Sequence, residues 1–354
     1  MKRYLICSIC LMIVVSLFPL KAMGAGPEYV MKVSIGNPEK DYYHGWSPFL
    51  VFKNEAEARS GGRLKVELLP LILGKSTGDE LSVVKEGVVQ ARDFADGHFA
   101  STYPPIQVLS IPYLFENREI AWKVLDGPFG ESLIEEMARK TGLRPLYWME
   151  NGGFRHYSNN TRRVRTPADM KGLKIRTMES LLHMKIVSDL GGRAIPIEWA
   201  EVYEALEAGI VNGQENSIST FLLPKFEKVQ KFVTLDAHVY STYALLMNDK
   251  WYRNLPVDLQ EVIQVAGRIS LVVNRGLSIT NEVMGLEYLR SKGVDVYIPT
   301  RAEKAEWKRI TQQSGIQWLK KNIGREWVDA VLKATLQAER DLDRSLSNSP
   351  LVTE

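Results

Sequence analysis

Cysteine is nearly absent from this 354-residue chain: both residues, Cys7 and Cys10, lie within the first ten positions. The remainder has no thiol, which excludes disulfide bonds, thiolate metal ligands and a cysteine nucleophile there. Proline and glycine are modest at 16 and 26 residues, which excludes collagen-like and low-complexity folds. With 45% hydrophobic residues, the composition is that of a globular protein of two domains that can bury its cores without disulfide bonds or structural metals.

A hydrophobic run over residues 4–20 follows two basic residues at the start of the chain. At about 17 residues it is short for a membrane span, and the small residues Ala22 and Gly24 suit signal peptidase. We expect residues 1–24 to be a signal peptide cleaved near Gly24, which predicts a periplasmic protein with no stable membrane insertion afterwards. An uncleaved N-terminal anchor is the alternative, and a lipid anchor fits less well because neither cysteine ends the run.

Net charge is also lacking once this segment is set aside. The whole chain has a formal charge of +3, and residues 1–24 carry three basic residues and no acidic one, which leaves 42 basic and 42 acidic residues. A neutral surface has no general electrostatic attraction for phosphate backbones or anionic lipid. We therefore expect no nucleic-acid partner, and any recognition of anions has to be local.

Motifs of common catalytic and cofactor sites are absent from the sequence as well. There is no G-x-S-x-G elbow, no G-x-x-x-x-G-K-[ST] phosphate loop, no H-E-x-x-H and no G-x-G-x-x-G that opens a helix. The histidines lack the spacing that places two imidazoles on one helical face for a metal. A sequence does not show which carboxylates meet, so a hydrolase with a carboxylate pair is unsupported rather than excluded. We expect no cofactor, no metal site and no enzymatic activity. The five histidines are His44, His98, His156, His183 and His238.

Hydrophobic periodicity predicts strands that alternate with helices, a pattern typical of α/β units with mainly parallel strands. A threonine, a proline and an aspartate at 166, 167 and 169 predict a short capped helix before one of these strands. The predicted strands are Tyr29–Ile35, Arg63–Leu69, Gln90–Ala95 and Leu173–Arg176, and the predicted helices are Trp46–Arg59 and Asp79–Glu86.

A much longer periodic stretch opens at Pro256 and continues for about 36 residues. At about 1.5 Å per residue such a helix reaches roughly 54 Å, which is longer than one domain, so it would lie against both domains. Three glycines weaken the pattern, and two helices that meet near Gly276 are the alternative. Thr300 and Glu303 form a capping-box pattern that opens two further helices, which end at about Arg344.

Arginines beside aromatic and glycine residues are the features best suited to ligand binding. Arg176 closes a predicted strand, and in an open α/β sheet the carboxyl ends of the strands line the ligand crevice. A buried guanidinium binds a planar anion, and a carboxylate accepts two parallel hydrogen bonds from it. Arg155 follows two glycines and lies between aromatic residues, as a residue beside a hinge or a pocket wall would. For an arbitrary arginine, a salt bridge on the surface is the alternative.

Three motifs follow one another in the second half of the chain, over Asp169–Arg176, Pro196–Leu206 and Gly209–Asn216. With these motifs the sequence resembles the solute-binding proteins of tripartite ATP-independent periplasmic (TRAP) transporters, of the dicarboxylate-binding (DctP) type. The segments Leu109–Phe115 and Gly153–Arg155 match further parts of that family. The resemblance covers nearly the whole chain after the expected signal peptide.

This resemblance implies an α/β, two-lobed periplasmic-binding-protein fold with a hinge and a long helix that spans both lobes. Residues 26–152 and 242–281 would form lobe I, and residues 153–241 and 282–345 lobe II. Residues 346–354 would be a frayed tail.

The resemblance also implies a function, the capture of a small organic acid in the cleft between the lobes and its delivery to the membrane subunits of a TRAP permease. Arg176 would pair with the ligand carboxylate, and Trp199 and Phe154 would be aromatic walls unless they are ordinary core residues. Arg155, Asn216 and Asp96 would complete the polar contacts, although Asp96 also reads as a turn aspartate before a glycine. The rival functions are a binding protein of an ATP-driven importer, a partner of a membrane sensor, and a secreted α/β enzyme.

The sequence departs from the family pattern at a few positions near these motifs. Asn212 stands where aspartate is common, Ser217 where proline is frequent, and Glu198 where a neutral residue is more usual. Asp96 adds a negative charge to the first lobe. A second ligand carboxylate near Asp96 would be disfavoured, whereas a hydroxyl or an amine would be favoured.

Overall fold

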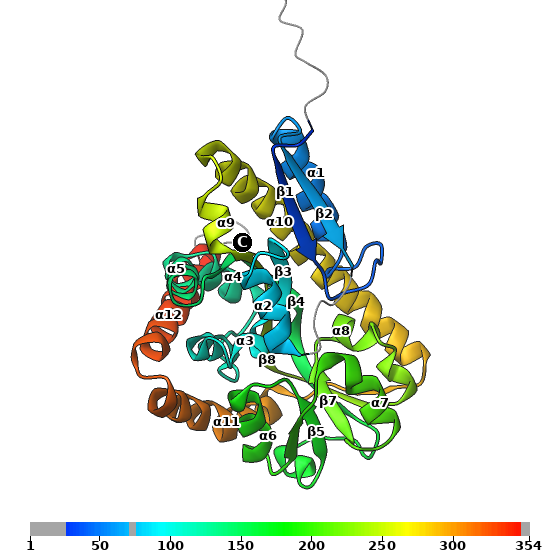
Figure 1. Cartoon of the computed structure of the whole chain (residues 1–354). Helices are drawn as coiled ribbons and strands as arrows, with labels where there is room; N and C mark the ends of the chain where they lie inside the picture. The colour runs from blue at the N-terminus through cyan, green and yellow to red at the C-terminus, as the bar shows by residue number, and fades with distance from the viewer. Residues whose placement is uncertain (1–25, 71–75, 348–354) are drawn as a thin grey trace, which may run out of the picture.

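A single sheet of nine strands links the two lobes of the protein (Figure 1). The computed structural model describes residues 26–70 and 76–347, so the expected signal peptide and cleavage site lie outside the described residues. The strand order is β2-β1-β3-β8-β4-β7-β5-β6, with β9 added beside β8. The first lobe is built on β1 (Tyr29–Ser34), β2 (Leu64–Leu69) and β3 (Ala91–Ala95), and the second on β5 (Lys174–Thr177), β6 (Arg193–Pro196) and β7 (Gly213–Asn216).

Two long strands, β4 (Leu143–Asn159) and β8 (Phe232–Asn248), run antiparallel through the centre of the sheet. Register shifts interrupt their pairing between Pro145 and Trp148, Glu150 and Gly153, and Arg155 and Tyr157. Such irregularities bend and twist a strand pair. Parallel pairing, which the sequence predicts for most strands, occurs among the outer strands on either side of this antiparallel centre and between β8 and β9.

The helix α10 (Val257–Ser291) is the long helix that the periodicity predicts, and it is unbroken over 35 residues. It packs on α1 and β4 in its first part and on α8 near its end, and it runs along the molecule from one lobe to the other (Figure 1). The alternative of two helices that meet near Gly276 is wrong, because one helix runs through this position without a break. Two other glycines of the helix, Gly267 and Gly285, serve close packing. A Cβ on Gly267 would lie 2.7 Å from a ring carbon of Tyr147, and one on Gly285 would lie 2.8 Å from Ile218.

The other predicted elements are confirmed within two residues at each end, except that the last helix ends at Ser347 rather than at about Arg344. Thr166 and Asp169 form a capping box on a short 3-10 turn, and Thr300 and Glu303 form one at the start of α11. The remaining helices are α1 (Ser47–Arg59), α2 (Thr77–Lys85), α3 (Asp96–Phe99), α4 (Arg118–Leu125), α5 (Pro128–Thr141), α6 (Leu181–Asp189), α7 (Val202–Glu207), α8 (Ile218–Leu222), α9 (Asp249–Arg253), α11 (Arg301–Asn322) and α12 (Glu326–Ser347); β9 is Asp295–Tyr297, and 3-10 turns are Pro104–Ser110, Pro167–Met170, Trp199–Glu201 and Phe226–Lys228.

The last two helices connect the lobes on the side away from α10. α11 packs on α6 of the second lobe, whereas α12 packs on α4 and α5, which the expected boundaries assign to lobe I (Figure 1). The boundaries expected from the resemblance assign all of residues 282–345 to lobe II. α12 also continues to Ser347, into the expected tail, and the rest of that tail lies outside the described residues.

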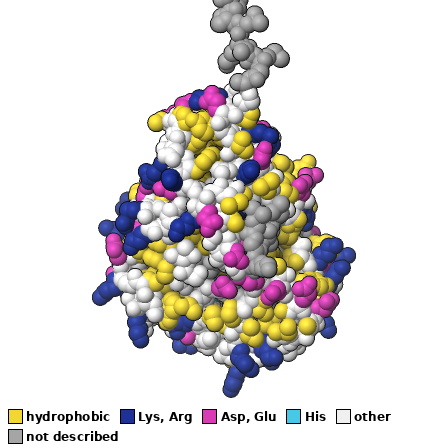
Figure 2. Space-filling view, in the orientation of Figure 1, with side chains coloured by type: hydrophobic (Ala, Val, Ile, Leu, Met, Phe, Trp, Pro, Cys, Tyr) yellow, Lys and Arg dark blue, Asp and Glu magenta, His cyan; other side chains and the backbone are white. Residues whose placement is uncertain are grey.

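Three apolar clusters fill the interior. One lies between α1, β1, β2 and the first part of α10, and another surrounds α7, α8 and the end of α10. The largest extends from β3, α4 and α5 to α11 and α12. On the face that Figure 2 presents, basic and acidic side chains are interspersed. Within residues 26–70 and 76–347, no helix is long and apolar enough to cross a membrane, and no group of three or more metal-binding side chains is placed to hold a metal.

Candidate ligand-binding site

A cavity of about 140 Å³ lies between the two lobes. An apolar cavity of about 150 Å³ is large enough for benzene, so this one suits a compact small molecule. Its walls come from β3 and the start of α2 in the first lobe, and from the ends of β5 and β7 in the second. The lining includes Asn37, Thr77, Glu80, Arg92, Asp93, His98, Asn151, Arg176, Met178, Glu198, Trp199, Asn216 and Tyr243.

Arg176, on β5, contributes a buried cation to this cavity, and its residue surface is 1% exposed. Its Nε donates to the carbonyl oxygen of Ile197 at 2.8 Å. Its Nη2 is buried without a hydrogen-bond partner among the described residues, none of which forms an ion pair with it. Burial lowers the pKa of Arg176 to about 10, against the opposing effect of Glu215, so the group is a cation at neutral pH. A buried donor without an acceptor costs about 1–3 kcal/mol, a cost that a bound anion would remove.

Trp199 and Asn216 lie beside Arg176 on the cavity wall. The guanidinium carbon of Arg176 is 5.8 Å from the centre of the Trp199 ring, a distance at which a cation is attracted to the ring face. Asn216 ends β7, and its Nδ2 donates to Gln214 Oε1 at 2.7 Å. This bond fixes the orientation of the amide on the wall. The structure thus brings three of the six residues predicted from the sequence to one cavity.

The first lobe adds a second arginine that the sequence analysis missed. Arg92, on β3, is buried and forms an ion pair with Glu80 of α2 at 2.8 Å. Beside it, Asp93 accepts hydrogen bonds from the Gly36 amide at 2.8 Å and from the Tyr243 hydroxyl. Burial is the largest cause that raises the pKa of Asp93. Arg92 could not be singled out from the sequence. The alternation of residues along a strand does not show which of its two faces borders a cavity.

Glu198 joins the two sides of the cavity. Its carboxylate accepts from the Thr77 amide and from the Thr77 hydroxyl, each at 3.2 Å. Glu198 precedes the 3-10 turn of Trp199 in the second lobe, whereas Thr77 opens α2 in the first. The negative charge that departs from the family pattern therefore makes a direct link between the lobes.

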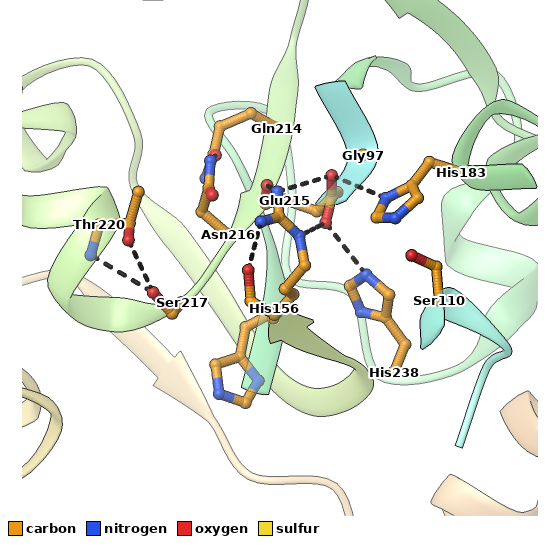
Figure 3. Close-up of polar contacts among 12 residues, drawn as sticks. Gly97, Ser110, His156, His183, Gln214, Glu215, Asn216, Ser217, Thr220 and His238 are labelled. Carbon is orange, nitrogen blue, oxygen red and sulfur yellow. Dashed lines mark hydrogen bonds and ion pairs between the residues drawn. The ribbon is translucent and has the colours of Figure 1, made fainter. Parts of the chain in front are cut away.

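Arg155 lies outside the lining of the cavity, although the sequence predicts a ligand contact for it. Its Nη2 donates to Glu215 Oε1 at 2.9 Å, its Nη1 donates to Ser241 Oγ at 3.0 Å, and both Arg155 and Glu215 are 1% exposed. The carboxylate of Glu215 also meets His183 and His238 (Figure 3). Burial opposes ionisation of Glu215, but Arg155 and His183 hold its pKa well below the usual range. The Arg155 guanidinium is thus committed to a protein carboxylate.

Asp96 and Phe154 also lie outside the lining of this cavity. One Asp96 oxygen accepts from the Gly97 amide at 2.8 Å and the other from Ser110 at 3.2 Å, and burial raises the pKa of Asp96. Phe154 packs edge-on against Tyr240 in the largest apolar cluster. These are the turn and core roles that the sequence left open. Ser217, where proline is frequent, caps α8 and donates to the Asn151 carbonyl at 2.7 Å.

Two lobes on one sheet, a helix that spans both, and a small cavity between them define the class of two-lobed solute-binding proteins. The chain belongs to one family of this class, described as bacterial extracellular solute-binding protein, family 7 (DctP), whose model matches residues 37–321. The resemblance to TRAP solute-binding proteins drawn from the sequence motifs is therefore confirmed.

Individual relatives agree with this assignment. The chain is 35% identical over 272 residues to a solute-binding protein of Verminephrobacter eiseniae, covering 77% of this chain and 80% of that protein. It is 31% identical to the 2,3-diketo-L-gulonate-binding periplasmic protein YiaO of Escherichia coli, over 69% of this chain and 74% of that one. The crystal structure of the sugar acid binding protein DctPAm from Advenella mimigardefordensis, in complex with galactonate, matches with a TM-score of 0.82 and 30% identity, over 89% of this chain and 100% of that chain.

Proposed function

We propose that this protein captures a small organic acid in the cavity between its lobes, holds its carboxylate with Arg176, and delivers it to the membrane subunits of a TRAP permease. The observation that carries the proposal is the Arg176 guanidinium, which is buried, cationic and without an anionic partner among the described residues. Since a buried charge is otherwise paired, the missing partner is best supplied by a ligand.

The ligand carboxylate would accept hydrogen bonds from Arg176, while Asn216 and Trp199 line the same wall. Charge-assisted hydrogen bonds contribute about 1.5–3 kcal/mol each, and the Nε bond to Ile197 holds the guanidinium before the ligand arrives. Less freedom is then lost on binding than with a flexible lysine. The diketogulonate and galactonate named for two relatives are organic acids of the proposed kind.

In this proposal Arg155 supports the site indirectly. It forms an ion pair with Glu215 on β7, the strand that ends in Asn216. Asp96 and Phe154 support the local turn and the core. The protein acts by binding and release without chemical turnover, outside the cytoplasmic membrane.

The proposal is tested by thermal unfolding of the purified protein with mono- and dicarboxylates, keto acids, sugar acids and aromatic acids. A ligand that binds only the folded state raises the melting temperature by mass action. We expect at least one of these acids to do so and to be recovered unchanged. Uptake of that acid into vesicles that contain the cognate permease should depend on added protein. Chemical conversion of the acid would point to an enzyme instead, and co-purification with a membrane sensor alone would point to signalling.

A further inference from the structure

The two buried arginines of the cavity lie on strands of different lobes. Arg92 is on β3 and Arg176 is on β5, and the strands β8, β4 and β7 lie between these two in the sheet. Both side chains line the same cavity. A ligand held by Arg176 therefore shares its cavity with Arg92.

These two guanidinium groups differ in what already binds them. Arg176 has no carboxylate partner among the described residues, whereas Arg92 holds Glu80 at 2.8 Å and donates to Ser34 Oγ at 3.2 Å. The side chains of Arg92 and Glu80 are only 5% and 15% exposed, so the pair is shielded from water. Arg92 Nε is buried and has no hydrogen-bond partner among the described residues. Arg92 thus has a donor that no described residue uses, within a pair whose charges balance when Glu80 is ionised.

Several further groups surround Glu80 with negative charge. Asp79 neighbours it on α2, Asp93 lies on β3, and Glu198 reaches across from the second lobe; Arg92 is the opposing cation, and the four act on Glu80 electrostatically. A second ligand carboxylate would add negative charge here, where like charges repel at short range in a poorly solvated site. A hydroxyl instead can accept from Arg92 and donate to a carboxylate.

We propose that the Arg92–Glu80 pair selects the ligand end distal to Arg176, favouring an uncharged end that bears a hydroxyl over a second carboxylate. This inference rests on the proposed function, since it requires a carboxylate at Arg176. Within it, Glu80 is a specificity-determining residue: its charge neutralises Arg92 and repels a dicarboxylate.

The state of Glu80 makes this selection dependent on pH. Burial raises the pKa of Glu80 to about 7; Arg92 opposes the shift, and Glu198, Asp93 and Asp79 add to it. Below that pH the carboxyl becomes neutral and Arg92 loses its anionic partner. The preference against a second carboxylate should then weaken between pH 8 and pH 6, a range in which carboxylic acid ligands are ionised at both ends.

The test uses ligand pairs that differ only at the distal carbon, namely D-galactonate with galactarate and D-erythronate with meso-tartrate. Binding is measured by titration calorimetry at pH 8 and pH 6 with the wild-type protein, with Glu80→Gln, and with Glu86→Gln, a matched change at an exposed position after α2. At pH 8 we expect the wild type and Glu86→Gln to prefer the hydroxyl-ended acid of at least one pair by tenfold or more. The preference should fall at least threefold at pH 6. Glu80→Gln should show the smaller preference at both pH values.

Several outcomes overturn the inference. Equal or tighter binding of the dicarboxylate at pH 8, or binding of other acids with neither hydroxyl-ended acid bound, refutes it while the proposed function stands. A preference in Glu80→Gln equal to that of the wild type does the same, provided that the melting temperature shows the variant to be folded. If that variant does not fold, the pH dependence of the wild type decides, and a preference that is unchanged between pH 8 and pH 6 counts against the inference. Failure of every organic acid to bind overturns this inference and the proposed function together.

Discussion

Arg155 and Glu215 form an ion pair between β4 and β7 that is almost completely buried, with each residue 1% exposed. Each member of the pair has further partners: Arg155 also donates to Ser241, and Glu215 also contacts His183 and His238. Buried charges with all partners in place hold two strands in a fixed relation. This relation keeps β7 and its terminal residue Asn216 in position beside the cavity.

Breaking this pair from one side should destabilise the protein. Arg155→Met or Glu215→Gln leaves one buried charge uncompensated, which costs roughly 3–5 kcal/mol in the free energy of unfolding. The double variant Arg155→Met, Glu215→Met should lose less than the sum of the single losses, and denaturant unfolding measures all three. Ligand affinity of the folded fraction should change less than tenfold, because Arg155 does not line the cavity. A loss of binding without a loss of stability would instead make Arg155 a direct ligand contact.

His238 should make stability depend on pH. Burial disfavours its cation, but Asp236 and Glu215 overcome this effect and raise its pKa to about 9. A pKa raised in the folded state gives stability that is fully present below the unfolded pKa near 6.5 and is lost as the pH rises through 9. The unfolding free energy should fall by roughly 3 kcal/mol between pH 6.5 and pH 10.

The matched control for this titration is His238→Gln, which should be less stable at pH 6.5 and should show a flatter profile up to pH 10. His156 is a comparison within the wild type, since burial lowers its pKa to about 3 and it stays neutral throughout. An identical slope in the wild type and in His238→Gln would contradict this account.

The glycines of α10 should respond oppositely to alanine. Gly276 is exposed and nothing lies within 4 Å of a Cβ placed on it, so Gly276→Ala should stabilise the protein by about 0.5–1 kcal/mol through helix propensity. At Gly267 the added Cβ would lie 2.7 Å from the Tyr147 ring, and overpacking of this kind costs about 1–3 kcal/mol. Thermal unfolding of the two variants should shift in opposite directions. Equal shifts would mean that α10 does not pack on β4 at Gly267.

The link between Glu198 and Thr77 should slow ligand release. Thr77→Val keeps the side-chain size but removes the hydroxyl that donates to Glu198 at 3.2 Å. A net hydrogen bond to a charged group is worth about 1.5–3 kcal/mol, so we expect a rise of roughly tenfold or more in the dissociation rate. Stopped-flow displacement measures this rate. Thr77→Ser, which keeps the hydroxyl, should behave as the wild type. Equal dissociation rates in all three proteins would rule out a role for this link in holding the two lobes together around the ligand.

Much of the fold could be predicted from the sequence because its signals are local. The predicted strands and helices end within about three residues of those observed, since periodicity and capping residues such as Thr300 with Glu303 act over a few positions. The strands β4 and β8 carried no such signal. They are buried on both faces, so their sequences do not alternate, and their pairing joins residues far apart in the chain.

The candidate site divides in the same way. Arg176 at a strand end and the motif around Asn216 could be found from position and resemblance. Whether an arginine is free or occupied depends on partners far away in the sequence: Arg155 meets Glu215, 60 residues later. The Arg92–Glu80 pair across β3 and α2 could likewise be recognised only once the fold had brought the two together.

The most direct test of the central claim is the affinity of Arg176 variants for the acid that the thermal screen identifies, measured by titration calorimetry. Arg176→Ala removes one partner of a buried charge pair, a loss of roughly 3–5 kcal/mol that corresponds to a hundredfold to several thousandfold weaker binding. Arg176→Lys keeps the charge but loses the planar pair of donors, and it should also bind at least tenfold more weakly. Near-native affinity in a folded Arg176→Ala protein would contradict the account.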